Sequence, residues 1–238
     1  MDLPSPLHRG RLLRRYKRFL ADVRLDDGRE VTAHCANPGS MLGLLAEGAE
    51  VWLAGNSDPK RKLAWSWEMV RADGVLVPVN TSNPNRIVPE ALAAGALPEL
   101  SGYDLIRREV RYGQGSRIDL LLQGPERPAC YVEIKNVHLR RDGMAAFPDS
   151  VTARGTRHLK ELVDMVGAGA RAVLLFIVQR EDCEAFTVAG DLDPAYAEAL
   201  ELAARAGVEV LCYDCSVTLE SVDLRRWLPT AFDWKRAL

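Results

Sequence analysis

The chain has 238 residues, a length that fits one large domain or two of moderate size, and we expect two. Its 47% hydrophobic and 27% charged residues are typical of a folded protein and exclude a disordered or collagen-like chain. No apolar stretch approaches the roughly 20 residues that cross a bilayer, and the start MDLPSPLHRG lacks the apolar segment of a signal peptide, so we expect a cytoplasmic protein without a membrane partner.

A dense cluster of cations lies near the start of the chain. The net charge is −2, so any attraction to a polyanion must come from such a local cluster. Its members are Arg9, Arg11, Arg14, Arg15, Lys17 and Arg18. These side chains form either a solvated face or a surface that follows the phosphate backbone of DNA.

Short alternating hydrophobic segments follow this cluster, separated by turn signals such as Asp26-Asp27-Gly28 and Asp73-Gly74. The pattern predicts five strands, over residues 18–25, 29–35, 51–53, 62–70 and 75–79. Such spacing is typical of a small closed barrel of the OB-fold kind. Trp65 and Trp67 then lie in the barrel core or, as the alternative, stack on bases together with Phe19.

The pattern changes after Asn80, where a helix is predicted over 89–95. Next come strands at 105–112, 116–122 and 129–135, a helix from Ser150 or Thr152, a buried strand at 172–178, a helix capped by Asp193 and a strand at 208–213. We therefore expect an α/β fold of mixed α+β character, in which an OB-like β-barrel (1–84) precedes a mixed-sheet domain with flanking helices (85–238).

Three polar side chains interrupt the apolar strands of the second domain. Alternation places Glu133 and Lys135 on one face of the strand 129–135. The connection 123–128 makes a hairpin with the strand 116–122, which brings Asp119 beside Glu133. Two adjacent carboxylates in a partly dry site repel each other, and a shared proton, a cation or a divalent metal relieves the repulsion.

One interpretation of Asp119, Glu133 and Lys135 is a metal site. Mg²⁺ or Mn²⁺ uses one or two carboxylates and keeps positions for water and phosphate oxygens, so Asp119 and Glu133 are the predicted ligands. Lys135 then positions the attacking hydroxide or stabilises the transition state, and the predicted chemistry is metal-dependent phosphodiester hydrolysis. The alternative reading is a salt bridge between paired strands.

Other polar residues are weaker candidates for the same site. Glu109 on the neighbouring strand is either an auxiliary acid or the ion-pair partner of Arg107 or Arg111. Arg154 and His158, one helical turn apart, either reach a phosphate or lie on an ordinary helix surface. Asp149 is expected to help cap the helix that follows it.

Seven blocks of the sequence carry a family resemblance. They are RRYKRFLADV (14–23), HCANPGSM (34–41), VNTSNPNR (79–86), LSGYD (100–104), SRIDLLL (116–122), YVEIKNV (131–137) and FPDSVTARGTRHLKEL (147–162). On these blocks the chain resembles the bacterial sugar fermentation stimulation protein A family, SfsA, over essentially its whole length. The resemblance implies an N-terminal OB-like domain and a C-terminal domain similar to the PD-(D/E)xK, restriction-endonuclease-like nucleases.

The resemblance also has functional implications. It implies DNA binding without strong sequence preference and a role in regulating genes of sugar metabolism, notably maltose. The acid of the nuclease motif maps to Asp119 and its E-x-K to Glu133 and Lys135, while Ile118 replaces the proline usually written before the acid. Three hypotheses stay open: a metal-dependent nuclease, a non-catalytic DNA-binding regulator, and a metal-dependent enzyme acting on a small phosphorylated metabolite. Monomer and homodimer are both open.

Overall fold

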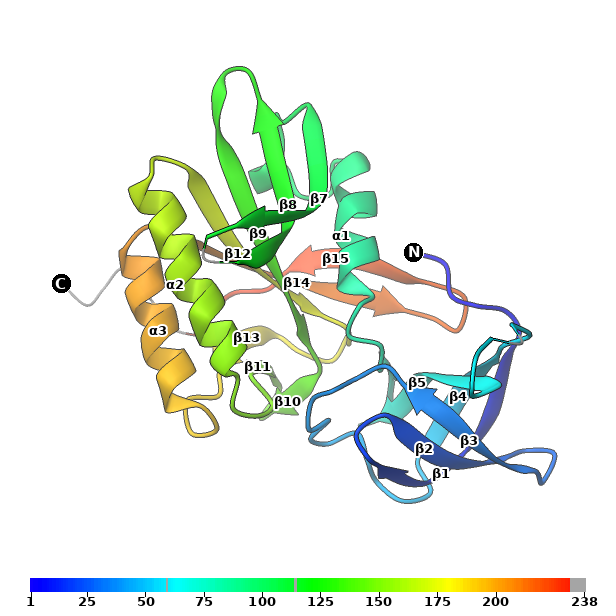
Figure 1. Ribbon diagram of the computed structural model, residues 1–238. Coiled ribbons are helices and arrows are strands. Elements are labelled where there is room, and N and C mark those ends of the chain that lie inside the picture. The colour runs from blue at the N-terminus through cyan, green and yellow to red at the C-terminus, as the bar shows by residue number, and fades with distance from the viewer. Residues whose placement is uncertain (59, 114, 232–238) are drawn as a thin grey trace.

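The computed structural model describes residues 1–58, 60–113 and 115–231, and its first part is a barrel (Figure 1). The strands are β1 (Leu7–Tyr16), β2 (Leu20–Leu25), β3 (Glu30–Cys35), β4 (Glu50–Gly55), β5 (Trp65–Ala72) and β6 (Val75–Pro78). They follow the order β3-β2-β1-β4-β5-β6, and a parallel pairing of β3 with β5 closes the sheet. Leu12, Val23, Leu53 and Trp67 fill the interior, as predicted for Trp67.

Four members of the basic cluster, Arg9, Arg11, Arg14 and Arg15, lie in a strand that the sequence analysis did not predict, and Lys17 and Arg18 follow in the turn after it. In β1, Gly10 and Leu12 point inward while Arg9, Arg11 and Arg14 are exposed, so the cations mark the solvent face. Strand β1 pairs with β2 on one side and β4 on the other. It is therefore a central strand of the barrel and not a flexible basic arm.

The second part is a mixed sheet with helices on both faces. Its elements are α1 (Pro84–Ala93), a 3₁₀ turn (Pro98–Leu100), β7 (Leu105–Tyr112), β8 (Ser116–Gly124), β9 (Arg127–Val137), α2 (Ala153–Gly167), β12 (Arg171–Val178), α3 (Pro194–Arg205), β14 (Glu209–Val217) and β15 (Val222–Trp227). The strand order is β15-β14-β12-β9-β8-β7. Strand β12 runs parallel to β9 and β14, because α2 and α3 provide the crossovers that parallel neighbours need.

Two apolar layers enclose this sheet. One layer packs Ile87 and Val88 of α1 against Leu120 and Val132. The other packs Leu159 and Leu162 of α2, with residues of α3, against the opposite face. Figure 1 shows α2 and α3 side by side. Among the residues described, no helix is long and apolar enough to cross a membrane.

A small sheet and a final strand add to the predicted elements. Strands β10 (Leu139–Arg141), β11 (Met144–Phe147) and β13 (Ala185–Val188) form a separate three-stranded sheet, and β15 extends the large one. These strands are short or lack alternation, so sequence patterning did not reveal them. The chain start also returns to this part, because Asp2 bridges to Ser221 and Leu3 binds the carbonyl of Glu220. The division at residues 84 and 85 stays a prediction.

Asp149 does not cap helix α2, contrary to our expectation. The cap is Thr152, whose hydroxyl accepts the N–H of Gly155. The Asp149 carboxylate instead accepts the N–H of Met41 at 2.8 Å, and its carbonyl accepts the hydroxyl of Ser40. Asp149 therefore joins the second part to a barrel loop.

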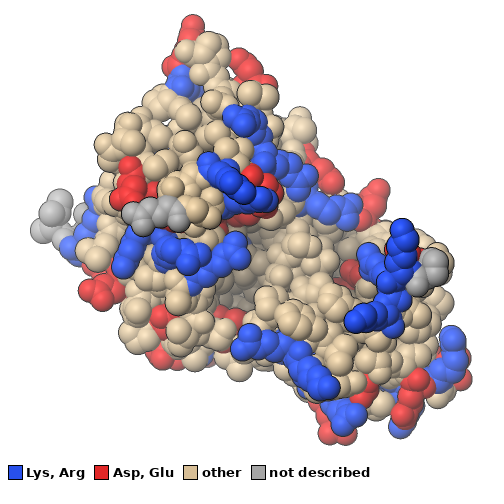
Figure 2. Space-filling view, viewed as in Figure 1, with Lys and Arg blue, Asp and Glu red and all other residues tan. Residues whose placement is uncertain are grey.

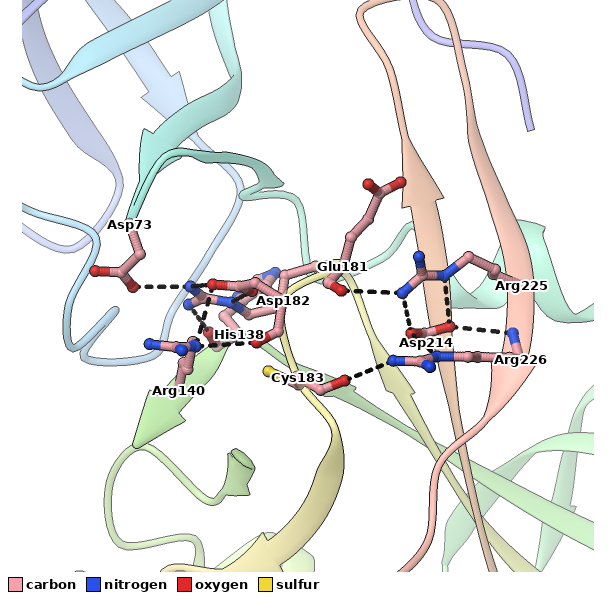
Figure 3. Close-up of polar contacts among 10 residues, drawn as sticks. Asp73, His138, Arg140, Glu181, Asp182, Cys183, Asp214, Arg225 and Arg226 are labelled. Carbon is pink, nitrogen blue, oxygen red and sulfur yellow. Dashed lines mark hydrogen bonds and ion pairs between the residues drawn. The ribbon is translucent and has the colours of Figure 1, made fainter. Parts of the chain in front are cut away.

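A buried guanidinium fixes the junction between the two parts. The Arg180 side chain is 2% exposed and donates to Asp182 at 2.6 Å and to the carbonyl of His138 at 3.0 Å. It also donates to Asp73 of the β5–β6 turn at 2.8 Å. Figure 3 shows Asp73 reaching from the barrel toward Asp182. The Arg180 side chain therefore connects the barrel to the second part.

Amide groups complete the junction. Asn37 of the barrel contacts His138 at 3.4 Å, and Gln179 contacts Asn83, Asn136 and His138. Burial lowers the pKa of His138 to about 4, so the imidazole is neutral and serves as a hydrogen-bonding group. The barrel is thus held by directional polar contacts.

Replacing Arg180 by Leu should lower the free energy of unfolding by about 3 kcal/mol, because buried and partly buried acceptors lose their charged partner. Urea denaturation followed by tryptophan fluorescence measures the change. The matched control is Arg24→Leu, which removes an ion pair with Glu30 in which both side chains are more than half exposed. The control should cost less than about 1 kcal/mol, and equal losses for the two variants would contradict the role of Arg180.

Candidate active site

The predicted acids lie where strands β8 and β9 separate. The ladder between them runs from Gly124–Arg127 to Leu120–Val132. Asp119 is the next residue of β8, and its Oδ2 accepts the backbone N–H of Ile134 at 2.7 Å. Its Oδ1 accepts the side-chain amide of Asn85 at 3.2 Å. The Asp119 carboxylate therefore takes a position in the gap between the two strands.

Glu133 lies beside Asp119 and is engaged on one oxygen. Its Oε1 accepts the ammonium of Lys135 at 2.7 Å and the Nδ1 of His158. Its Oε2 is buried and has no hydrogen-bond partner among the described residues. One carboxylate oxygen is therefore left for a further ligand.

The two acids have opposite pKa shifts. Burial, followed by the negative charge of Glu133, raises the pKa of Asp119 to about 6. Burial also acts to raise the pKa of Glu133, but the hydrogen bond from His158 and the charge of Lys135 hold it below its usual value. At neutral pH the fold thus keeps Glu133 ionised and makes the charge on Asp119 costly.

His158 is a positioning residue for Glu133 and not a surface residue. Its side chain is 3% exposed. Arg154 Nε, which can only donate, lies 3.3 Å from His158 Nε2, so Nε2 accepts and Nδ1 carries the proton that is donated to Glu133. The pair Arg154 and His158 therefore reaches the acids through hydrogen bonds.

Glu109 does not join this cluster. It is exposed, with φ 53°, and stands opposite Asp119 between the pairs Arg108–Leu120 and Val110–Ile118. Throughout residues 1–58, 60–113 and 115–231 it has neither the predicted contact with the acids nor an ion pair with Arg107 or Arg111. Strand β8 also departs from strict alternation at this point, because Ile118 and Leu121, three positions apart, pack in the same layer under α2.

The cations of β1 differ in what they contact. Arg14 pairs with Asp22 at 2.8 Å, and Arg11 lies 3.7 Å from Glu50. Arg15 donates to the carbonyls of Asn37 and Gly39 and so supports a barrel loop. Lys17 and Arg18 form the exposed β1–β2 turn, and neither has an ion pair within the part of the chain that the structure describes.

Three residues near the acids were missed by the sequence analysis. Asn85 binds Asp119, as described above. The Tyr112 hydroxyl and both carboxylate oxygens of Glu161 are buried without hydrogen-bond partners among the described residues. Burial and the charges of Glu133 and Glu161 raise the pKa of Tyr112. Glu161 follows His158 by three positions on α2, and this helical spacing was the available signal.

A cleft leads from solvent to Lys135. It measures about 360 Å³ and is lined by Asn37, Pro38 and Gly39 of the barrel, by Lys135 and Asn136 of β9, and by the segment 147–152. The Lys135 side chain is 12% exposed and also binds Glu133. Lys135 therefore links the cleft between the two parts to the acid pair.

Comparison with known proteins identifies the family. Residues 13–79 match the description "SfsA N-terminal OB domain", and residues 82–221 match "Sugar fermentation stimulation protein RE domain". The chain belongs to the sugar fermentation stimulation protein family. The resemblance and the architecture predicted from the sequence, an OB barrel followed by a mixed-sheet domain, are thereby confirmed.

Relatives of SfsA type match along their whole length. The sugar fermentation stimulation protein homolog of Paramagnetospirillum magneticum is 59% identical over 224 residues, which cover 94% of this chain and 95% of the relative. The homolog of Rhodospirillum centenum is 56% identical over 229 residues, covering 96% and 98%. The structure of Pyrococcus furiosus SfsA in complex with Ca²⁺ aligns with a TM-score of 0.88 at 29% identity, covering 98% of each chain.

The acid pair of this SfsA-family chain fits a hard divalent ion. Its donors are carboxylate oxygens, and Glu133 Oε2 is a buried oxygen without a hydrogen-bond partner among the described residues. Within the described ranges, no group of three or more His, Cys, Asp or Glu side chains is placed to hold an ion. Waters or phosphate oxygens would therefore complete the coordination, as is usual for Mg²⁺.

In buffer containing EDTA, the wild type should lose stability relative to Asp119→Asn as the pH rises. The folded-state pKa of Asp119 is raised to about 6, so its stabilising contribution is complete below pH 4 and is lost as the pH rises through 6. The relative loss should be on the order of 2–3 kcal/mol, measured by urea denaturation between pH 4 and 7.5. Asparagine keeps the acceptor for Ile134 N–H.

The matched control for this experiment is Asp164→Asn, which changes an exposed acid on α2. Its stability should follow the wild-type profile at every pH. Parallel profiles for the wild type and Asp119→Asn would show that the Asp119 carboxyl is not perturbed.

Proposed function

We propose that this protein binds DNA with little sequence preference and hydrolyses phosphodiester bonds with a divalent metal held by Asp119 and Glu133. The observation that carries the proposal is the convergence of the buried Glu133 carboxylate, the half-buried Asp119 carboxylate and Lys135 beside a solvent cleft, with one carboxylate oxygen left unpaired among the described contacts. Ionisable side chains that are buried and perturbed in this way cluster at functional sites.

Each side chain has a distinct task in this proposal. The hydrogen bonds from Ile134 and Asn85 hold the Asp119 carboxylate in place, and His158 orients Glu133. A bound Mg²⁺ or Mn²⁺ supplies Lewis acidity and lowers the pKa of a water molecule. The Lys135 ammonium, which lines the cleft, would place positive charge where a phosphate oxygen becomes more negative. Glu109 has no task, because it lies outside the cluster.

The relatives support the same chemistry. The Pyrococcus furiosus relative was solved with Ca²⁺, a hard cation that uses oxygen ligands like those of Mg²⁺. The two matched domains carry OB and RE in their descriptions, and OB barrels commonly bind oligonucleotides. The family name supports a link to sugar fermentation, and DNA binding is the step at which control of such genes would act.

One observation favours the non-catalytic alternative. Lys135 and His158 already contact the same oxygen of Glu133, as expected for an ion pair that only stabilises the sheet. In that case the protein is a DNA-binding regulator without hydrolytic activity. Activity measurements on variants separate the two functions.

Purified protein should cleave plasmid or linear DNA in the presence of Mg²⁺ or Mn²⁺, and EDTA should abolish cleavage. Lys135→Ala and Asp119→Asn should each reduce the rate by about 100-fold or more, because the first removes a positive charge that acts on the transition state and the second removes a charged metal ligand. Gel electrophoresis of timed reactions measures the rate. The matched control is Lys160→Ala, an exposed lysine in the groove between α2 and α3.

The control should stay within threefold of the wild-type rate. A metal-dependent rate that Lys135→Ala leaves unchanged contradicts the assigned site. DNA binding by the wild type without any cleavage supports the regulator instead.

Millimolar Mn²⁺ should raise the melting temperature of the wild type but not that of Glu133→Gln. A ligand that binds the folded state at 100 times its Kd stabilises it by about 2.7 kcal/mol, and the variant loses the ionised donor. Differential scanning fluorimetry measures both shifts. The control is Glu184→Gln, an exposed acid that should keep the wild-type shift. Equal shifts in all three proteins would show that Mn²⁺ does not bind through Glu133.

A further inference from the structure

The arginines of the barrel surface are mostly neutralised by acids. Those with a carboxylate oxygen within 4.0 Å are Arg9, Arg11, Arg14, Arg24, Arg29 and Arg71. A neighbouring carboxylate cancels the field of a guanidinium at the distance of a bound phosphate. These side chains therefore offer little attraction to DNA, although they include much of the basic cluster seen in the sequence.

A second set of cations has no ion pair in the part of the chain that the structure describes. It includes Lys60, Lys62, Arg107, Arg111, Arg117, Arg127, Arg157 and Lys160. It also includes the six that concern the acid pair, the junction and the cleft wall: Lys17 and Arg18 in the β1–β2 turn, Arg61 before β5, Arg86 in α1, Arg108 in β7 and Arg154 in α2. All six residues are exposed. They come from both parts of the molecule and from distant points in the sequence.

Two of these cations contact residues that bind the acid pair. Arg108 donates to the carbonyl of Asn85, whose side-chain amide binds Asp119. Arg154 donates to His158, which binds Glu133. The acids are thus flanked by one guanidinium from β7 and another from α2.

Arg61 and Arg86 extend this arrangement across the junction between the barrel and the second part. The charges of Arg61 and Arg86 both act on the carboxyl of Glu68, a buried residue of β5 whose pKa burial raises. Arg86 follows Asn85 in α1, whereas Arg61 belongs to the barrel loop before β5. Both cations therefore lie within electrostatic range of one residue, Glu68, and they belong to the two different parts of the molecule.

The β1–β2 turn lies at another edge of the cleft. Arg15 donates to the carbonyls of Arg18, Asn37 and Gly39, and the last two residues line the cleft that reaches Lys135. Lys17 and Arg18 are held next to this wall. Figure 2 shows Lys and Arg side chains on several sides of the hollow between the two parts.

We propose that the sugar–phosphate backbone of DNA lies across the junction on Lys17, Arg18, Arg61, Arg86, Arg108 and Arg154, and that the ion-paired arginines of β1–β3 do not bind it. The DNA partner rests on the proposed function. The set borders both the acid pair and the cleft, so a backbone held by it presents a phosphodiester to Asp119 and Glu133.

The physical basis is counterion release. An unpaired cation that neutralises a phosphate releases a condensed counterion, so each contact adds about 0.7–0.9 to the slope of log affinity against log salt. An arginine already paired to a carboxylate must first break that pair and leave the acid facing the DNA. The unpaired set should therefore account for most of the salt dependence.

The test compares two double variants of the full chain that lose the same number of positive charges. Arg61→Ala/Arg86→Ala removes two unpaired cations, and Arg24→Ala/Arg29→Ala removes two ion-paired ones. Fluorescence anisotropy with a labelled 30-mer, as duplex and as single strand, measures affinity between 50 and 300 mM salt in EDTA, so that no cleavage interferes. Melting temperatures confirm that both variants are folded.

The first variant should bind at least tenfold more weakly, with a salt slope lower by about 1.4–1.8. The second should stay within threefold of the wild type. An equal or larger loss in the second variant, with DNA binding by the wild type intact, overturns this inference and leaves the proposed function standing. If the wild type binds neither the duplex nor the single strand, both are overturned.

Discussion

The position of the barrel against the mixed sheet depends on one buried positive charge. A guanidinium that is nearly inaccessible to water needs several acceptors to offset its lost hydration. Arg180 finds them on both sides of the junction, in Asp182 and the His138 carbonyl on one side and Asp73 on the other. Ion pairs impose stricter geometry than apolar packing, so the cleft beside Lys135 has a defined shape.

A second polar network, around Asp214, holds strand β15 in place. Asp214 is fully buried and accepts from Arg225 and Arg226, and these arginines also reach the carbonyls of Glu181 and Cys183 (Figure 3). Strand β15 is thereby fixed beside the loop that carries Arg180. The contacts of Arg180 and those of Asp214 thus form two groups that meet at the segment 180–183. They hold the framework on which the site depends.

The acid pair is a local conflict that the fold retains. Placing two carboxylates side by side in a site with little water costs free energy. Lys135 and His158 offset the charge of Glu133 on one oxygen, whereas Asp119 accepts only the neutral donors of Ile134 and Asn85. Replacing Asp119 by an apolar residue would relieve the repulsion. Two adjacent acids beside Lys135 therefore form the kind of destabilising arrangement on which the proposed function rests.

Local patterns in the sequence predicted much of this structure, and long-range contacts account for the rest. Alternation predicted β8 and β9, and a short hairpin placed Asp119 next to Glu133. The same reasoning failed for β1, because its outward positions are arginines and the segment was interpreted as a charged cluster. Local reasoning also predicted that Asp149 caps the next helix, whereas its partner Met41 lies 108 positions away. No local signal predicted the positive φ of Glu109, and helical spacing alone did not show that His158 faces the sheet.

The barrel is attached to the mixed sheet at both of its ends. Residues 1–3 lie along the β14–β15 hairpin, and residues 79–84 lead directly into α1. Exchange of a whole module between two copies of a protein normally proceeds by opening a single hinge. Here two copies could trade barrels only after the first residues had also come away from β14 and β15, so this second attachment disfavours the exchange of barrels between molecules.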